Sequence, residues 1–213
     1  MGCKNGGVHD LLQQWEAMLA RHTGSPDAAA SGRALLACWA EPHRRYHSVA
    51  HLQGVLAGVE ELAAYADDVD AVRLGAWYHD AVYAGRPDDE ERSAQMAESD
   101  LTGLDVEAAL VAEVARLVRM TVAHDPAPGD RNAAVLSDAD LATLALPPER
   151  YQRNSALIRT EYAHVSDDAF RAGRTKIIES LLAGPDLYRT PQGRQRWEAA
   201  ARANLNAELA SLR

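Results

Sequence analysis

Histidine and aspartate side chains interrupt three apolar segments of this chain. The segments SVAHLQGVL, GAWYHDAVYAG and LSDADLATLAL contain, in order, His51, the adjacent pair His79-Asp80, and Asp140. A buried carboxylate without a partner is unfavourable, so these side chains need a hydrogen bond or a bound cation. Imidazole nitrogen and carboxylate oxygen together suit a divalent transition metal, and four such donors leave positions open for water and substrate.

The spacing of apolar residues indicates which way His51 points. Val55 and Leu62 continue the helical stripe that starts at His51, so His51 faces the core. The same pattern also fits a core histidine that is satisfied by an ordinary hydrogen bond. His79 and Asp80 diverge by about 100° around a helix axis, yet both can reach an ion between their directions if other helices close around it. Alternatively, the pair forms only a structural hydrogen bond between helices.

Asp138 and Asp140 are two residues apart, and a helix would point them to opposite sides. Leu136 and Leu144 lie four residues before and after Asp140, which predicts that Asp140 shares their inward face. Asp138 is then better placed to cap or begin the helix. An accessory role for Asp138 at the site is the alternative.

Helical periodicity recurs along nearly the whole chain, and no segment is convincing as a strand. The patterns predict helices near residues 8–22, 25–41, 48–66, 69–83, 85–101, 105–124, 137–146 and 168–182, with further helices after Pro148 and Pro191. We therefore expect an all-α, single-domain helical bundle over residues 1–213, with about nine or ten helices. Within it we expect disorder over 1–7, a metal-site core over about 44–146, and helices in 147–213 that pack on this core.

The composition narrows the class of protein. Of the 213 residues, 47% are hydrophobic and 25% are charged, and the formal net charge is −9. This charge disfavours a nucleic-acid polymer or an anionic membrane as a partner, and no apolar run has the length of a membrane span. Cys3 and Cys38 are expected to be free thiols of a cytoplasmic protein, because no secretory segment is recognisable.

The order and context of these residues resemble the HD superfamily of metal-dependent phosphohydrolases, named for its adjacent His-Asp pair. The stretches RRYHSVAHL, AWYHDAVY, DDEERSA, SDADLATL, RTEY and ARANL look like one bacterial branch of that superfamily, from about Arg44 to the C-terminus. The resemblance implies an all-α fold and the metal ligands His51, His79, Asp80 and Asp140. It also implies hydrolysis of phosphomonoesters, phosphodiesters or nucleotide anhydrides, although a few members oxidise substrates at a di-iron centre or have lost catalysis.

One departure from the superfamily concerns the number of metal ions. Branches with two metals carry further histidines between the His-Asp pair and the final aspartate, whereas only His124 lies in that interval here. We therefore expect one divalent ion, either Mn, Fe, Co, Ni or Zn with Mg also compatible, and a second ion stays open. His124 is also explained as a histidine at a helix C-terminus, which the helix dipole favours.

The expected reaction is the attack of a metal-activated water on phosphorus. Asp80 would serve it as a metal ligand, Glu90 would take the proton of the water, and His47 would contact the substrate or protonate the leaving group. Glu90 lies in the acidic run DDEE, and acidic residues at the start of a helix are also favoured by the dipole alone.

Substrate contacts are expected near the motif and on later helices. The candidates are Arg44, His47, Tyr83, His124, Arg159 and Lys176. An arginine can bind phosphate through two parallel hydrogen bonds. The arginine and lysine candidates are also explained as solvated or ion-paired surface residues. The expected ligand is a small phosphorylated metabolite, with a nucleotide as first choice. The amphipathic ends at 8–22 and 195–212 could pack on the core or on a second copy, so a homodimer stays open.

Three other functions stay open at this point. The bundle could be a catalytically silent regulator that binds the metal or a nucleotide, or it could hold a di-iron oxygenase centre with Glu90 or His124 as further ligands. It could also be a helical interaction protein without a site. The fold alone does not decide between these functions.

Overall fold

The chain folds into helices and connecting loops in the computed structural model, which describes the backbone of residues 4–212 and the side chains of residues 7–212. Within that range there is no strand. The α-helices and the two 3₁₀ helices are, in chain order, α1 (Lys4–Leu19), α2 (Ala28–Trp39), α3 (Val49–Leu62), η1 (Ala63–Tyr65), α4 (Val69–Tyr78), α5 (Asp89–Gly103), α6 (Ala108–Met120), α7 (Arg131–Leu141), η2 (Ala142–Ala145), α8 (Pro148–Glu161), α9 (Asp167–Ala183) and α10 (Pro191–Leu212). The all-α bundle of nine or ten helices is confirmed.

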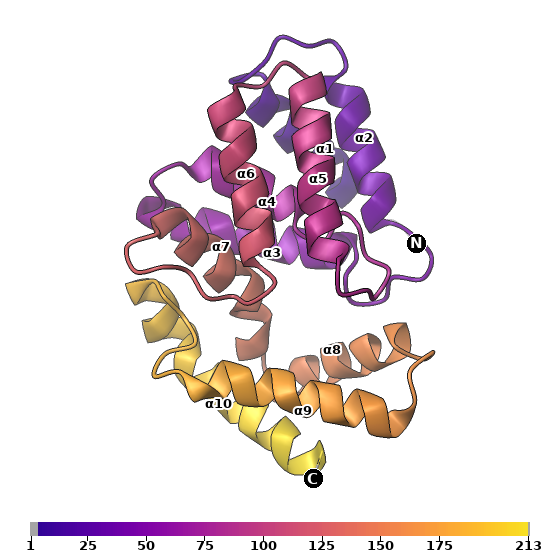
Figure 1. The fold of residues 1–213 in the computed structure, drawn as a ribbon, viewed down its shortest axis with the longest axis vertical. Helices are drawn as coiled ribbons and strands as arrows, with labels where there is room; N and C mark the ends of the chain where they lie inside the picture. Colours follow the sequence, from indigo (N-terminus) through magenta and orange to yellow (C-terminus); the bar gives the residue numbers. More distant parts are fainter. Residues whose placement is uncertain (1–3, 213) are drawn as a thin grey trace.

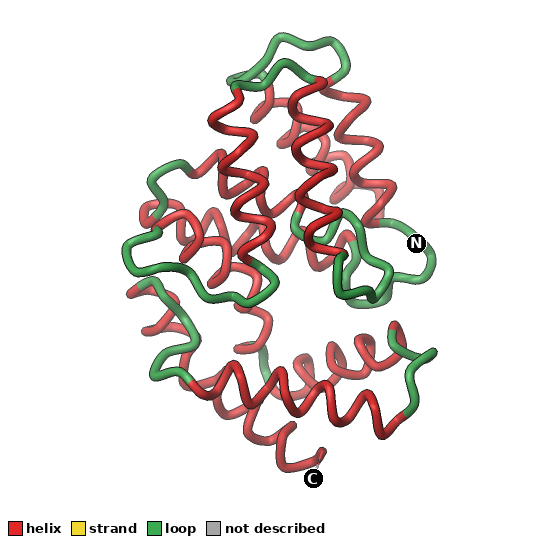
Figure 2. The backbone as a smooth tube through the Cα atoms, in the orientation of Figure 1, coloured by secondary structure: helices red, strands yellow, loops and turns green. Residues whose placement is uncertain are grey.

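The helices lie in a larger group, α1–α7, and a smaller group, α8–α10, below it in Figure 1. In the larger group α5 packs along α6, and α3 packs on both α4 and α7. The short helix η2 follows α7 and packs on α10, so it connects the two groups. The loops before α5 and after α6 lie on the side of the larger group that faces α8 and α9 (Figure 2).

Three tryptophans form the part of the core that supports the predicted site. Trp15 and Trp77 pack edge to face with their ring centroids 5.0 Å apart. The indole N–H of Trp39 donates to the carbonyl of Trp77 at 3.0 Å, and the Trp39 ring lies 5.2 Å from the ring of His79. The polar residues of the site therefore rest directly on a close-packed apolar core.

A glycine allows α3 and α7 to approach closely. A Cβ atom at Gly58 would lie 3.0 Å from the backbone of Ala139, which is closer than ordinary van der Waals contact. Gly58 lies two turns after His51, and Ala139 immediately precedes Asp140. The small residue at this crossing therefore sets the distance between two of the predicted metal ligands.

The helix α4 is shorter than predicted, so the His-Asp pair does not lie inside a helix. The predicted helix over 69–83 ends at Tyr78, His79 is its C-terminal cap, and Asp80 lies in the following turn. The buried guanidinium of Arg44 donates to the carbonyls of Asp80 and Ala81 at 2.7 and 2.9 Å. Because a distant side chain takes these carbonyls, the turn is stabilised in place of further helical hydrogen bonds.

The helix α7 begins six residues earlier than predicted, at Arg131, where the side chain of Asp130 accepts a hydrogen bond from the N–H of Ala133. Asp138 is therefore inside the helix, and the expectation that it caps or begins this helix is wrong. Its buried carboxylate instead accepts the N–H groups of Arg189 and Thr190, at 2.7 and 2.8 Å, and the hydroxyl of Thr190. Asp138 thus holds the start of α10 against α7.

The N-terminal helix begins at Lys4, so the expected disorder over 1–7 does not extend to residues 4–7. Cys3 lies outside the described residues. Cys38 is a free, half-buried cysteine, and burial raises the pKa of its thiol. Among the described helices, none has both the length and the apolar character needed to cross a membrane.

Candidate metal centre

Three helices bring the predicted metal ligands together at the edge of the core. Nε2 of His51, in the first turn of α3, lies 3.0 Å from Oδ1 of Asp140, in the last turn of α7. Nε2 of His79 lies 3.3 Å from Nε2 of His51 and 3.7 Å from the same aspartate oxygen. Oδ2 of Asp80 lies 3.3 Å from Nε2 of His79. His51, His79 and Asp140 therefore have the mutual spacing of a metal-binding group, and Asp80 lies beside this group in contact with His79.

Hydrogen bonding and packing fix the orientation of both histidine rings. Nδ1 of His79 lies 2.8 Å from the carbonyl oxygen of Ala76. A carbonyl can only accept, so Nδ1 carries the proton and the lone pair of the neutral ring is on Nε2. Metal-binding histidines are typically oriented in this way. The ring of His51 is held by packing between Tyr46 and Trp39, with centroids 4.9 and 6.2 Å away.

The charges of this cluster favour a cation. No arginine or lysine among residues 7–212 pairs with the carboxylates of Asp80 and Asp140. Burial alone would raise the pKa of both, but the neighbouring histidines, His79 above all, hold each pKa well below its usual range. Burial alone would lower the pKa of His79, but Asp80 and Asp140 raise it to about 9. In metal-free protein this cluster therefore retains a proton, and two nitrogen and two oxygen donors fit a divalent transition metal in its place.

A cavity of about 550 Å³ opens beside these ligands, and α8 and α9 form its opposite wall. The sequence-predicted residues His47, Tyr83, Glu90 and His124 all line this cavity. Burial raises the pKa of Glu90, and the nearby charge of Asp80 adds to this effect. A carboxylate with a raised pKa is a better base near neutral pH.

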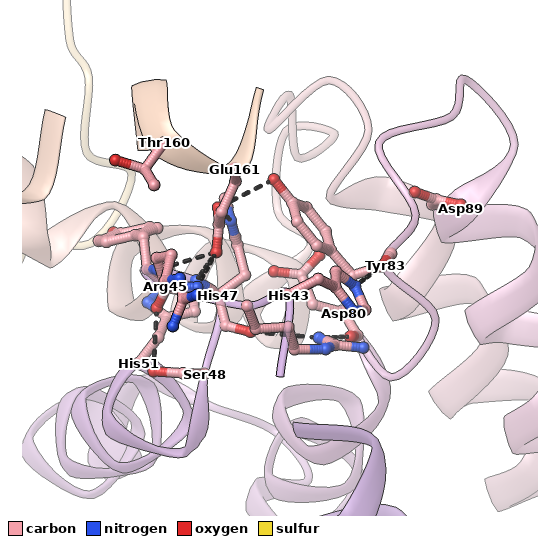
Figure 3. Close-up of polar contacts among 12 residues, drawn as sticks. His43, Arg45, His47, Ser48, His51, Asp80, Tyr83, Asp89, Thr160 and Glu161 are labelled. Carbon is pink, nitrogen blue, oxygen red and sulfur yellow. Dashed lines mark hydrogen bonds and ion pairs between the residues drawn. The ribbon is translucent and has the colours of Figure 1, made fainter. Parts of the chain in front are cut away.

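A glutamate that the sequence reasoning did not identify, Glu161 at the end of α8, holds His47 in place (Figure 3). Its Oε2 accepts the Nδ1–H of His47 at 2.7 Å and the hydroxyl of Tyr83 at 3.2 Å. Its Oε1 accepts the backbone N–H groups of Arg45, Tyr46 and His47 at 2.6, 2.8 and 3.0 Å. The rings of His47 and Tyr83 stack with centroids 4.2 Å apart. Because Nδ1 is taken, Nε2 is the ring nitrogen of His47 that remains for a ligand in the cavity.

Glu161 gives no signal in the periodicity of the sequence. It lies in the stretch RTEY at the end of a helix of largely polar residues, where a glutamate is typical of an exposed surface. In the folded chain its side chain is 2% exposed. Burial alone would raise the pKa of Glu161, but the hydrogen bonds from His47 and the backbone lower it to about 2. The partners lie between 78 and 116 residues away in sequence, so only the tertiary structure brings them together.

His124 lies against the predicted metal ligand Asp140. Its Nε2 is 3.3 Å from Oδ2 of Asp140, and its Nδ1 is 3.3 Å from the hydroxyl of Ser137. The backbone of His124 has φ +48°, in the left-handed region that non-glycine residues rarely adopt. Burial lowers the pKa of its imidazole. The helix predicted over 105–124 ends at Met120, so His124 lies in the turn beyond the helix and not at its C-terminus, and it reaches the edge of the candidate metal centre.

The predicted phosphate-binding cations lie away from the cavity. Arg44 is buried behind the His-Asp turn, with its guanidinium bonded to backbone carbonyls and to Glu41. Arg159 pairs with Asp167 and with two carbonyls at the end of α8, and Lys176 is exposed and does not line the cavity. Among the described residues that line the cavity, Arg174 is the one arginine or lysine.

Comparison with known proteins identifies no relative of this chain. No family model matches the chain, and no curated protein or solved structure matches it. The geometry of this site and the resemblance of its motifs to the HD superfamily are therefore what bears on the function of this protein.

Proposed function

We propose that the protein is a metal-dependent phosphohydrolase of the HD type that acts on a small phosphorylated metabolite. The observation that carries the proposal is the convergence of His51, His79, Asp80 and Asp140 at one side of a cavity that also contains acid–base groups. A cavity of this volume suits a small organic ligand, and a nucleotide is our first choice. We also propose a cytoplasmic location, for which the free thiol of Cys38 is suitable.

When bound at the cluster, a divalent ion supplies a Lewis acid and acidifies a coordinated water. In this proposal Glu90, which lines the same cavity, would take the proton of the water as its oxygen attacks phosphorus. His47 would give a proton from Nε2 to the leaving oxygen as the P–O bond breaks. Glu161 orients His47 for this transfer because it accepts the Nδ1–H of the same ring.

The proposal is tested by metal analysis together with a substrate screen. Purified protein should contain a transition metal and should release phosphate from at least one nucleotide or sugar phosphate with Mn, Co, Ni or Mg. His79→Ala and Asp80→Asn should lose both properties without loss of helical circular dichroism. Asp125→Asn is the matched control, because this exposed aspartate follows His124 but pairs only with Arg189. Full metal retention in His79→Ala would contradict the metal site, and a metal-loaded protein without turnover would favour the silent regulator.

A di-iron oxygenase is the second candidate, because His124 contacts Asp140 and extends the donor set beyond that of one ion. This function predicts two iron atoms per chain, visible absorption and oxygen consumption. It further predicts that His124→Ala halves the iron content. A phosphohydrolase with one metal predicts that this variant keeps its metal.

A further inference from the structure

The charges that line the cavity are distributed unevenly. Asp80, Asp140 and Glu90 lie on the side of the metal cluster, whereas Arg174 of α9 is the one lysine or arginine among the described lining residues. An anionic ligand therefore finds its only permanent positive side chain on the wall opposite the metal ligands.

Arg174 is held on one edge and open on the other. Its Nε donates to Oε1 of Glu208 at 2.7 Å, and its Nη2 donates to Oε2 at 3.0 Å. The Arg174 side chain as a whole is 12% exposed, so most of it is shielded from bulk solvent. Nη2 also donates to the hydroxyl of Tyr151 at 3.4 Å. Nη1 donates to none of the described residues, so a guanidinium fixed in this way presents the two N–H groups of Nη1 to a ligand.

The negative charge of Glu208 is shared by several donors. Besides Arg174, its carboxylate accepts the hydroxyls of Tyr151 and of Ser155, the latter at 3.2 Å. Two neutral hydroxyls occupy part of the hydrogen-bonding capacity of the Glu208 carboxylate. Glu208 therefore positions the guanidinium of Arg174 without accepting from all of the N–H groups of that guanidinium. Both hydroxyl residues also line the cavity. The cluster thus has the construction of an anion-binding site.

The walls of the same cavity also include apolar side chains that solvent reaches. Val122 is 63% exposed and Ile177 is 54% exposed, and both line the cavity together with Ile158 and Leu181. Large apolar side chains at this exposure are unusual in the described chain, which has only one other, Val8. A ligand that covers them with an apolar group removes this surface from water.

We propose that Arg174 binds a second anionic group of the substrate, so that, among small phosphorylated metabolites, an organic phosphate with an apolar middle and an anionic far end is favoured over a mononucleotide. The far group is a carboxylate or a second phosphate, since the same guanidinium edge binds either. The identity of the scissile phosphate rests on the proposed hydrolase function, whereas the anion site on α9 rests on the contacts of Arg174.

Non-hydrolysable ligands test this site without turnover. Isothermal titration calorimetry in the presence of Mn²⁺ compares ω-phosphonocarboxylates of two to six carbons with alkylphosphonates of equal length. Alkane-α,ω-bisphosphonates form a third series, which distinguishes a phosphate from a carboxylate as the far group. A charge-assisted hydrogen bond leads us to expect that at least one doubly anionic ligand binds about tenfold tighter than its alkylphosphonate partner.

Variants of Arg174 test whether this residue causes the preference for doubly anionic ligands. Arg174→Gln should reduce the preference to within about twofold, and Arg174→Gln/Glu208→Gln should do the same without leaving Glu208 buried and unpaired. Lys176→Gln is the matched control on the same helix and should keep the preference. The inference is overturned if no ligand length shows a preference, or if the preference survives in the double variant with native circular dichroism.

Ligand binding and hydrolysis, measured on the same protein, distinguish the anion-site proposal from the hydrolase proposal. A preference that depends on Arg174, without hydrolysis of any phosphate ester under any metal, supports the anion site and refutes the hydrolase. Hydrolysis of simple esters without any such preference supports the hydrolase and refutes the anion site.

Discussion

Replacement of Glu161 by glutamine tests the contact that ties α8 to the candidate site. The pKa of this carboxyl group is about 2 in the folded protein, against an ordinary value of 4.5. A difference of this size corresponds to about 3 kcal/mol of stability at neutral pH. For a chain of this length, we expect Glu161→Gln to lower Tm by about 6 to 12 °C at pH 7.

The pH dependence of this effect follows from the direction of the shift. Because folding lowers the pKa of Glu161, its contribution is complete above about pH 5 and is lost as the pH falls toward 2. The stability difference between wild type and Glu161→Gln should therefore fall from about 3 kcal/mol at pH 7 to about 1 kcal/mol at pH 3. Guanidinium denaturation followed by circular dichroism measures both values.

Glu149→Gln is the matched control for this experiment, because Glu149 is exposed in the first turn of the same helix. It should change stability by less than about 0.5 kcal/mol. A Glu161→Gln variant as stable as wild type at pH 7 would refute the reasoning. A stability difference that stays constant from pH 7 to pH 3 would refute it as well.

Three further predictions concern helix packing and the roles of charged residues. Gly58→Ala should lower the free energy of unfolding by about 1–2 kcal/mol, since the new Cβ meets the backbone of α7. Gly54→Ala on the same helix meets no atom, and it should raise the free energy of unfolding by up to about 1 kcal/mol. Equal effects of the two variants in thermal unfolding would contradict the close approach of α3 and α7. Asp138→Asn should lower Tm and leave the metal content unchanged, whereas Asp140→Asn should release the metal. Equal metal loss from both variants would contradict a structural role for Asp138 and a metal-binding role for Asp140. Arg44→Lys should lower stability by about 2 kcal/mol, because lysine cannot keep the same fork of carbonyl contacts; a raised KM at full stability would instead indicate phosphate binding.

Local patterns were sufficient for the helical class and for the direction of Asp140. Leu136, one turn before Asp140 on the same helix, predicted that Asp140 faces inward, and Asp140 does reach the candidate site. The same pattern did not predict that Asp138, on the opposite side of the helix, is the more deeply buried of the two. The metal role of the cluster stays a prediction. The ends of α4 and α7 were not predictable in this way, since the guanidinium of Arg44 and the cap of Asp130 decide them.

The substrate side of the site was the least predictable from sequence. Arg174 and Lys176 are both on α9, and two residues along a helix turn the side chain to the opposite face. α9 has few buried residues to mark its inner face, and Ile178 is the one fully buried side chain of this helix. The choice of Lys176 therefore had no local support. What selects Arg174 is its pairing with Glu208, which lies 34 residues later.

The contact between Asp138 and the start of α10 bears on how this chain can be divided. A protein truncated after residue 146 would lose the three donors that residues 189 and 190 supply to Asp138, and it would open this fully buried carboxylate to water. It would also uncover η2, on which α10 packs. The last three helices are therefore no detachable module. A transplant of these helices onto another bundle would have to include an aspartate at the matching position of the receiving helix.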